Sequence, residues 1–295
     1  MDNEELARRI ELFNKQHYGS LKDSIASLRD LINAHGDVIE ELAISKRKVL
    51  SWQVYFETLI HKLRFSSLSI CKLSEGILIE SHKHQIKVEM IDYPSICILT
   101  RAVLENYLTL DYIFYNNLSI EEKLFRFKLW EVSGLLSRQN FNTHSNEDFE
   151  NQKESEKAQI EAIKAELSKM PEYSTLKKQQ LDNLNKFGLP RIESWNKLIL
   201  SSNLKNDFFG PAYSLLSNYA HSEFISIIQF KQSNLGLNID DVEVFLSTCI
   251  TIVRSLNSLS IEWLTSNYEE CNVCFSEFPP ELQSNIKIWA GIGRK

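Results

Sequence analysis

Apolar residues recur three or four positions apart along most of the 295-residue chain. This spacing is typical of helices that bury one face, whereas strands alternate with a period of two. It predicts an all-α fold, a helical bundle of long helices. The expected helices cover residues 49–79, 92–115, 119–138 and 240–268, with shorter ones from Trp195, from Ala212 and after Pro280.

Two of these helices have recognisable starts. Asp92 precedes Tyr93-Pro94, which suits a capping carboxylate followed by a proline in the first turn. Ser119 stands three residues before Glu122, the spacing of a capping box. Both signals are local, and we expect helices to begin at these residues.

The polarity of the chain divides it into three parts. Residues 1–48 are predicted to form an N-terminal helical arm, residues 49–270 the helical core, and residues 271–295 a C-terminal helical tail. An insertion at about 142–187 is dense in Glu, Lys and Gln, with Pro171 near its middle. We expect it to be a protruding charged hairpin that buries little, and a surface on which a partner protein can dock.

Composition narrows the classes of function. Only 9 glycines and 6 prolines are present, so few turns are expected, and His82 and His84 lie in a polar connector. The net charge of −6 argues against binding nucleic acid through bulk charge, although it leaves a local basic site open. The most apolar region, residues 96–115, contains three charged residues, so we expect a buried helix and no membrane span.

The five cysteines and the acidic N-terminus indicate a cytoplasmic protein. The cysteines are few and mostly set in apolar runs, which predicts reduced thiols and no disulfides. Cys271 and Cys274 form a single C-x-x-C without a second ligand pair. Phosphate-binding glycine loops, H-E-x-x-H zinc sites and G-x-S-x-G nucleophile elbows are absent from the sequence, so we expect no metal and no cofactor.

Polar residues within apolar helices are the best candidates for chemistry, because burying a polar group without a partner costs about 1–3 kcal/mol. Arg101 and Glu105 lie one turn apart, on one face of an otherwise apolar helix. They can lock two helices together, or they can face a site.

A second polar set lies on a later helix. Tyr213, Ser217 and His221 are four residues apart and form one stripe, with Asn218 beside it. A histidine with hydroxyl and carboxylate neighbours can act as a general base, contact a phosphate or close a structural network. We expect the two sets to meet in one buried pocket.

These residues also carry a resemblance. The segments Arg101-Ala-Val-Leu-Glu105 and Tyr213-Ser-Leu-Leu-Ser217-Asn-Tyr-Ala-His221 resemble an uncharacterised group of bacterial helical proteins with R-x-x-x-E and Y-x-x-x-S-x-x-x-H signatures. That group is similar to the HEPN superfamily. The resemblance implies a helical, often dimeric protein, and many HEPN proteins are metal-independent RNases or toxins of stress response and phage defence.

One departure from the HEPN motif concerns an arginine. In catalytic members an arginine precedes the histidine, with four to six residues between them. Here Leu216, Leu215 and Ser214 occupy those positions before His221. Arg101, on another helix, is the candidate to replace the missing cation.

The sequence thus supports three hypotheses. In the first, a metal-independent ribonuclease uses His221, Arg101 and Glu105 for catalysis, and Tyr213, Ser217 and Asn218 bind the substrate. In the second, the pocket is a non-catalytic sensor of a nucleotide or anion. In the third, the cluster is structural and the chain is an interaction subunit. For partners we expect a homo-oligomer, or a protein bound through the charged hairpin, with RNA or a nucleotide as ligand.

Overall fold

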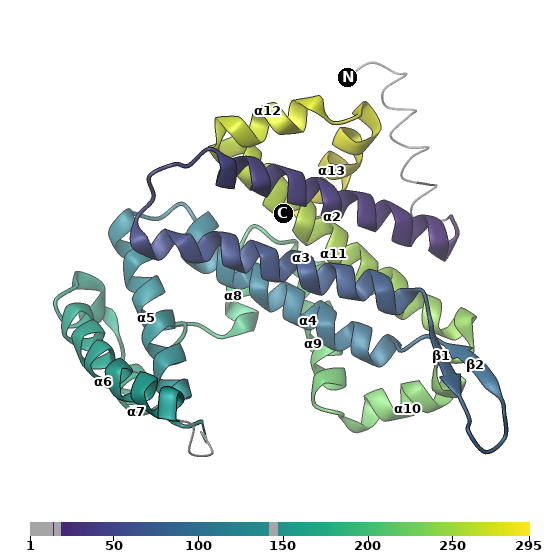
Figure 1. Cartoon of the computed structure of the whole chain (residues 1–295), viewed down its shortest axis with the longest axis horizontal. Coiled ribbons are helices and arrows are strands. Elements are labelled where there is room, and N and C mark those ends of the chain that lie inside the picture. The colour runs from purple at the N-terminus through teal and green to yellow at the C-terminus, as the bar shows by residue number, and fades with distance from the viewer. Residues whose placement is uncertain (1–13, 15–18, 142–146) are drawn as a thin grey trace. The chain divides into compact units, whose positions relative to one another are not determined.

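The computed structural model describes residue 14, residues 19–141 and residues 147–295. The described chain is helical apart from one two-stranded β-hairpin, so the all-α prediction is confirmed (Figure 1). Most of the predicted N-terminal arm before Leu21 lies outside the described residues. The chain divides into two compact units, Met1–Leu110 with Ile199–Lys295, and Asp111–Leu198.

The first unit is built around one long buried helix, α11. Its inward residues include Val242, Leu246, Val253 and Leu256, spaced three, four and seven apart as the sequence pattern predicts. The helices that pack on α11 come from both ends of the chain. The elements are α2 (Leu21–Ile44), α3 (Val54–Ser74), α4 (Tyr93–Leu110), α11 (Ile239–Asn267) and α13 (Pro280–Gly293).

Helix α11 rather than α4 is the most membrane-like helix among the described residues. By length and composition it could cross a membrane, but 72% of its most apolar window is buried inside the protein. Burial of this extent is what a core helix shows. The prediction that residues 96–115 form a buried helix holds for α4, whose Ile96, Val103 and Leu108 are buried.

A β-hairpin replaces part of a predicted helix. The predicted helix from residue 49 to about Ile79 is wrong at its end, because α3 ends at Ser74. Gly76 has a φ of +93°, a conformation that ends the helix, and strand-forming side chains follow it. The strands are β1 (Ile77–Glu80) and β2 (Lys87–Met90), paired antiparallel, and the exposed His82 and His84 lie in their turn.

Helices α4 and α9 carry the predicted polar residues. Helix α4 begins as predicted, since Asp92 Oδ1 accepts a hydrogen bond from the Ser95 amide at 3.1 Å. Helix α9 (Asn206–Ala220) begins six residues before the predicted start at Ala212, because it contains Pro211 instead of following it. The remaining elements of the unit are η1 (Ser51–Gln53), α10 (Phe224–Gln232), η4 (Asn234–Gly236) and α12 (Glu269–Glu277).

The second unit holds the charged insertion. Its elements are the π-helical turn η2 (Asp111–Tyr115), α5 (Ile120–Gln139), α6 (Glu147–Leu167), η3 (Pro171–Thr175) and α7 (Lys178–Lys186). The unit ends at Leu198, within α8 (Trp195–Ser201). The predicted capping box starts α5: Ser119 Oγ accepts from the Glu122 amide at 3.1 Å, and Glu122 accepts from the Ser119 amide at 3.3 Å.

The insertion buries more than its composition predicts. Ile160, Ile163 and Leu167 of α6 enter a core with Phe125 and Leu129 of α5, so the expectation of a hairpin that buries little is wrong. A few apolar residues at helical spacing suffice, since one narrow stripe can pack against a neighbour.

One buried charge of α6 also has a partner. The carboxylate of Glu156 accepts from Arg138 Nη1 of α5 at 2.7 Å. Glu156 is only 6% exposed and the side chain of Arg138 is 36% exposed, so this ion pair joins the two helices at the edge of their interface.

Candidate functional site

Arg101 and Glu105 form an ion pair on α4. Arg101 Nε donates to Glu105 Oε1 at 2.9 Å, one helical turn away, and the two side chains are 18% and 26% exposed. Partial burial disfavours the charge of Arg101, but the Glu105 carboxylate and the Tyr213 hydroxyl outweigh that effect and raise the pKa of Arg101. Arg101 is therefore a permanent cation held in a fixed orientation.

Two side chains from α9 complete the cluster. Arg101 Nη2 donates to Tyr213 Oη at 3.3 Å, and that hydroxyl donates to Glu105 Oε1 at 3.0 Å. Arg101 Nη1 lies 3.2 Å from His221 Nε2, and the guanidinium lies 5.4 Å from the centre of the Tyr213 ring. Burial, followed by the neighbouring carboxylate, raises the pKa of Tyr213, so the phenol stays protonated. One arginine thus connects two helices that the sequence separates by more than 100 residues.

The contact with Arg101 sets the hydrogen-bonding role of His221 Nε2. A guanidinium can only donate hydrogen bonds, so Nε2 of His221 must accept. The histidine is then neutral in this arrangement, with its proton on Nδ1. Arg101 has five N–H groups and uses three of them on Glu105, Tyr213 and His221. Two remain for an incoming anion.

The cluster is more open than predicted. The pattern of polar residues predicts a buried pocket, but His221 is exposed because it caps the C-terminus of α9, where the helix ends. Ser222 follows with a φ of +52° and turns the chain away toward α10. A solvent-facing edge of this kind is accessible to a macromolecule as well as to a small ligand.

Ser217 and Asn218 lie near the cluster in sequence but do not join it. Ser217 Oγ donates to the Tyr213 carbonyl at 2.8 Å, so it bonds to its own helix, as serine often does. The carbonyl of Asn218 accepts from the Glu223 amide at 2.9 Å and stabilises the turn after α9. The structure therefore brings together Arg101, Glu105, Tyr213 and His221 of the six predicted residues.

A second polar cluster, which the sequence pattern does not predict, lies in the core. His35 of α2 is fully buried; its Nδ1 lies 2.9 Å from Asn257 Oδ1 and its Nε2 lies 2.9 Å from Ser260 Oγ. Asn257 Nδ2 donates to Ser67 Oγ of α3 at 3.0 Å, so Asn257 Oδ1 faces the imidazole and accepts from its Nδ1. Burial lowers the pKa of His35 to about 4. Complete enclosure indicates a structural role.

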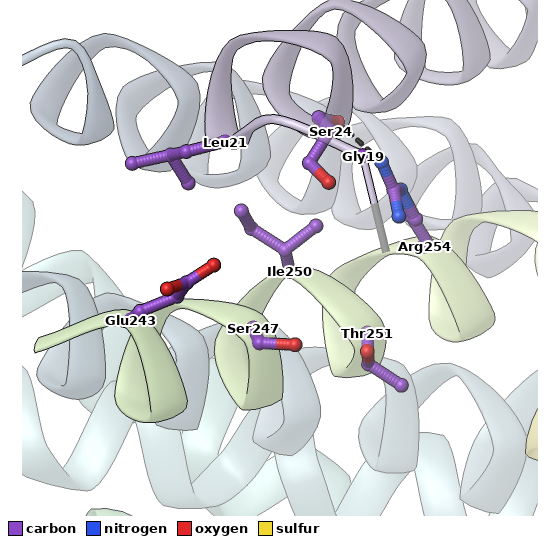
Figure 2. Close-up of a pocket in the computed structure, with 8 residues that line it drawn as sticks. All are labelled: Gly19, Leu21, Ser24, Glu243, Ser247, Ile250, Thr251 and Arg254. Carbon is purple, nitrogen blue, oxygen red and sulfur yellow. Dashed lines mark hydrogen bonds between the residues drawn. The ribbon is translucent and has the colours of Figure 1, made fainter. Parts of the chain in front are cut away.

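A small pocket opens between the start of α2 and α11 (Figure 2). At its end Arg254 donates to the Ser24 carbonyl and stacks over the Trp289 ring at 4.7 Å. Burial lowers the pKa of Arg254 to about 10. The pocket holds only about 20 Å³, the room of one water molecule, and is too small for a nucleotide.

The thiols of Cys97, Cys249 and Cys271 have partners outside the Arg101 cluster, although Cys97 lies one turn before Arg101 on α4. Cys271 is buried and its thiol donates to the Val38 carbonyl at 3.4 Å; burial raises its pKa to about 12. Cys97 and Cys249 face each other in the core with their sulfurs 3.9 Å apart. Among the described residues, no group of three His, Cys, Asp or Glu side chains is arranged to hold a metal ion.

Fold and site define the class: an all-α protein with a partly exposed Arg–Glu–Tyr–His cluster between two helices. Residues 69–236 match the model of a family of unknown function, DUF5677, and the chain belongs to that family. The matched segment contains all four residues of the cluster. No curated protein and no solved structure matches the chain.

Proposed function

We propose that this protein is a metal-independent ribonuclease whose reacting groups are His221 and Arg101. The observation that carries the proposal is the 3.2 Å contact between Arg101 Nη1 and the exposed His221 Nε2. It puts a permanent cation beside a neutral imidazole, which is the pair that phosphodiester cleavage needs. Arg101 comes from α4, so it replaces in space the arginine that the HEPN motif has on the histidine's own helix.

During cleavage, His221 and Arg101 each exchange a hydrogen bond to the other for one to the RNA. His221 Nε2 releases the Arg101 N–H and takes the proton of a ribose 2′-hydroxyl, whose oxygen attacks the adjacent phosphorus. The released N–H and the two unused ones of Arg101 bind the phosphate oxygens and stabilise their growing charge. The 5′ oxygen leaves and takes a proton from water, so the products are a 2′,3′-cyclic phosphate and a 5′-hydroxyl.

The other two residues hold Arg101 in place. Glu105 Oε1 accepts from both Arg101 Nε and Tyr213 Oη, which fixes the plane of the guanidinium. The hydroxyl of Tyr213 gives its one proton to Glu105 and accepts from Arg101 Nη2, so Tyr213 holds both side chains in place. Under this proposal Ser217 and Asn218 do not bind substrate themselves. Their carbonyls hold the end of α9, where they accept from the His221 amide at 3.2 Å and from the Glu223 amide at 2.9 Å.

The resemblance to HEPN proteins supports a wider setting. A nuclease of this kind would act in the cytoplasm of a bacterium, in stress response or phage defence. The net charge of −6 is consistent with a local contact to single-stranded RNA, whose exposed 2′-hydroxyls are accessible, and argues against broad binding to duplexes.

A second candidate is a non-catalytic module that binds a nucleotide or another anion. The observation that favours it is the same contact, since the lone pair of His221 Nε2 is already engaged by Arg101. In this candidate the histidine remains a hydrogen-bond partner of Arg101, and the two unused N–H groups bind the anion.

The test is cleavage of a 5′-labelled single-stranded RNA in the presence of EDTA. We expect wild type to produce cyclic phosphate ends, and His221→Ala to lose roughly 10²–10⁴-fold in rate. His82→Ala is the matched control, because His82 is an exposed histidine in the hairpin turn. Growth arrest on induced expression, followed by inspection of total RNA, repeats the comparison in cells.

The outcomes separate the two candidates. Intact RNA with every variant refutes the nuclease. A nucleotide that then raises the melting temperature of wild type but not of Arg101→Ala establishes the binding module. Cleavage that persists in His221→Ala refutes the assigned role of the histidine.

A further inference from the structure

The β1–β2 hairpin is a two-stranded ribbon with unpaired edges. Among the described residues no third strand joins it, and it extends beyond the helices of its unit (Figure 1). Two-stranded ribbons are at best marginally stable, and exposed edges pair readily with another strand. Ile79 and Ile86 on the ribbon are 48% and 55% exposed.

The hydrogen bonds of the ribbon show which groups face outward. The Ser81 amide donates to the Ile86 carbonyl at 2.9 Å, so Ile86 faces β1 with its backbone. The Ile91 amide donates to the Gly236 carbonyl at 3.3 Å, on the opposite side of the strand. Because backbone groups alternate along a strand, Lys87 and Glu89 direct their N–H and C=O groups away from β1.

We propose that two copies of this chain pair through the free edge of β2, and form a four-stranded antiparallel sheet about a two-fold axis. Only outward-facing residues can form the hydrogen-bonded pairs, so the longest symmetric register sets Lys87 opposite the partner's Glu89, and Glu89 opposite the partner's Lys87. Val88 then lies opposite the partner's Val88, and Ile86 opposite the partner's Met90.

This register matches side chains by chemistry on both faces. Residues of one face alternate with those of the other, so Ile79, Ile86, Val88 and Met90 share the apolar face. On the opposite face Lys87 Nζ lies 2.6 Å from Glu80 Oε1, and pairing adds the partner's Glu89 on its other side. Opposite-charge and apolar cross-strand pairs both stabilise a sheet.

The edge of β1 does not offer the same match. Its outward-facing residues are Leu78 and Glu80, and the equivalent symmetric register sets them against each other. An apolar side chain would then face a carboxylate. β2 is therefore the edge that pairs.

The ends of the edge leave room for the partner. Gln85 has a φ of +52° and turns the chain back toward its own β1. In the antiparallel pair the partner's Gln85 lies near Ile91, so the partner's strand ends before it would reach Gly236. Leu235 and Leu237 beside that glycine are 54% and 49% exposed, and they extend the contact to the partner's hairpin turn. The contact remains smaller than a standard interface of about 1,600 Å², so we expect dimers at micromolar concentrations.

Sedimentation of the full chain at about 1–100 µM measures the dimer, since one chain has a mass of 34.3 kDa. We expect wild type to reach twice that mass as concentration rises. Glu89→Pro removes one outward N–H of β2 and leaves the bonds to β1 intact, so it should remain a monomer. Leu78→Pro is the matched control, because Leu78 is the register partner of Glu89 on the other edge. It should still form dimers.

A charge exchange tests the register itself. Lys87→Glu sets glutamates against glutamates in a homodimer, and Glu89→Lys sets lysines against lysines, so each variant alone should be monomeric. Mixed together, the two should form a heterodimer. Wild type that stays monomeric at 100 µM overturns the proposal. So does a dimer that survives Glu89→Pro, or a mixture that does not associate.

Discussion

The buried histidine gives the chain a stability that depends on pH. His35 is neutral in the folded protein, where its pKa is lowered to about 4, whereas a histidine in the unfolded chain titrates near 6.5. Between these values the unfolded chain binds a proton that the folded protein cannot, so acid favours unfolding. Stability is full above about pH 6.5 and falls as the pH drops toward 4.

The size of the effect follows from the two values. Between pH 7.5 and pH 5 the linkage relation gives a loss of about 2 kcal/mol of unfolding free energy from this one group. A native domain has only about 5–15 kcal/mol in total, so the loss is large. With a denaturant slope near 2 kcal/mol per M, the urea midpoint should fall by about 1 M.

The assay compares wild type with His35→Gln at both pH values, by urea unfolding followed by circular dichroism. The variant lacks the titrating group, so it should lose about 2 kcal/mol less than wild type on acidification, whatever its stability at pH 7.5. His82→Gln, at an exposed histidine, should behave as wild type does. Equal losses in wild type and His35→Gln would refute the reasoning.

Two further substitutions test the two units. Gly236→Ala should destabilise the first unit by about 1–3 kcal/mol, because Gly236 has a φ of +86° and a Cβ would lie 2.4 Å from the Ile91 carbonyl oxygen; the melting temperature measures this. Arg138→Ala should destabilise the second unit by roughly 2–4 kcal/mol, because it leaves the buried carboxylate of Glu156 without its cation. Urea unfolding measures that loss.

Each of these substitutions has a control in the chain. Gly291→Ala should not lower the melting temperature, because Gly291 is an exposed residue of α13 and the added Cβ would meet no atom of a neighbouring element within 4 Å. Lys157→Ala breaks an exposed ion pair with Glu154 and should change stability by less than about 1 kcal/mol. A Gly236 variant as stable as the Gly291 variant, or an Arg138 variant no weaker than the Lys157 variant, would contradict the two explanations.

Local signals in the sequence predicted local structure. Asp92 and the pair Ser119 and Glu122 begin helices where expected, because a cap depends on residues within one turn. Conversely, the helix predicted to reach Ile79 ends at Ser74, because short apolar runs suit a strand as well as a helix. The glycine with positive φ decides between them, and its conformation is a property of the folded chain.

Four site residues could be selected from the sequence because polar groups inside apolar helices need partners. Arg101, Glu105, Tyr213 and His221 meet as that argument predicts, and the sequence could not show that the meeting point is open to solvent. His35 could not be identified from the sequence as a buried polar residue. It is a single polar residue on a helix with polar neighbours, and only the packing of α2 against α11 shows that it is enclosed.

The sequence by itself determined the helical class, the start of individual helices and the residues of the Arg–Glu–Tyr–His cluster, because helix period and capping act over a few residues. Only the tertiary structure decided that Arg101 contacts His221, that α6 shares a core with α5, and that β2 has a free edge. The helix contacts depend on which apolar faces pack together, and the edge depends on whether another strand pairs with β2. Both are decided by the whole chain at once.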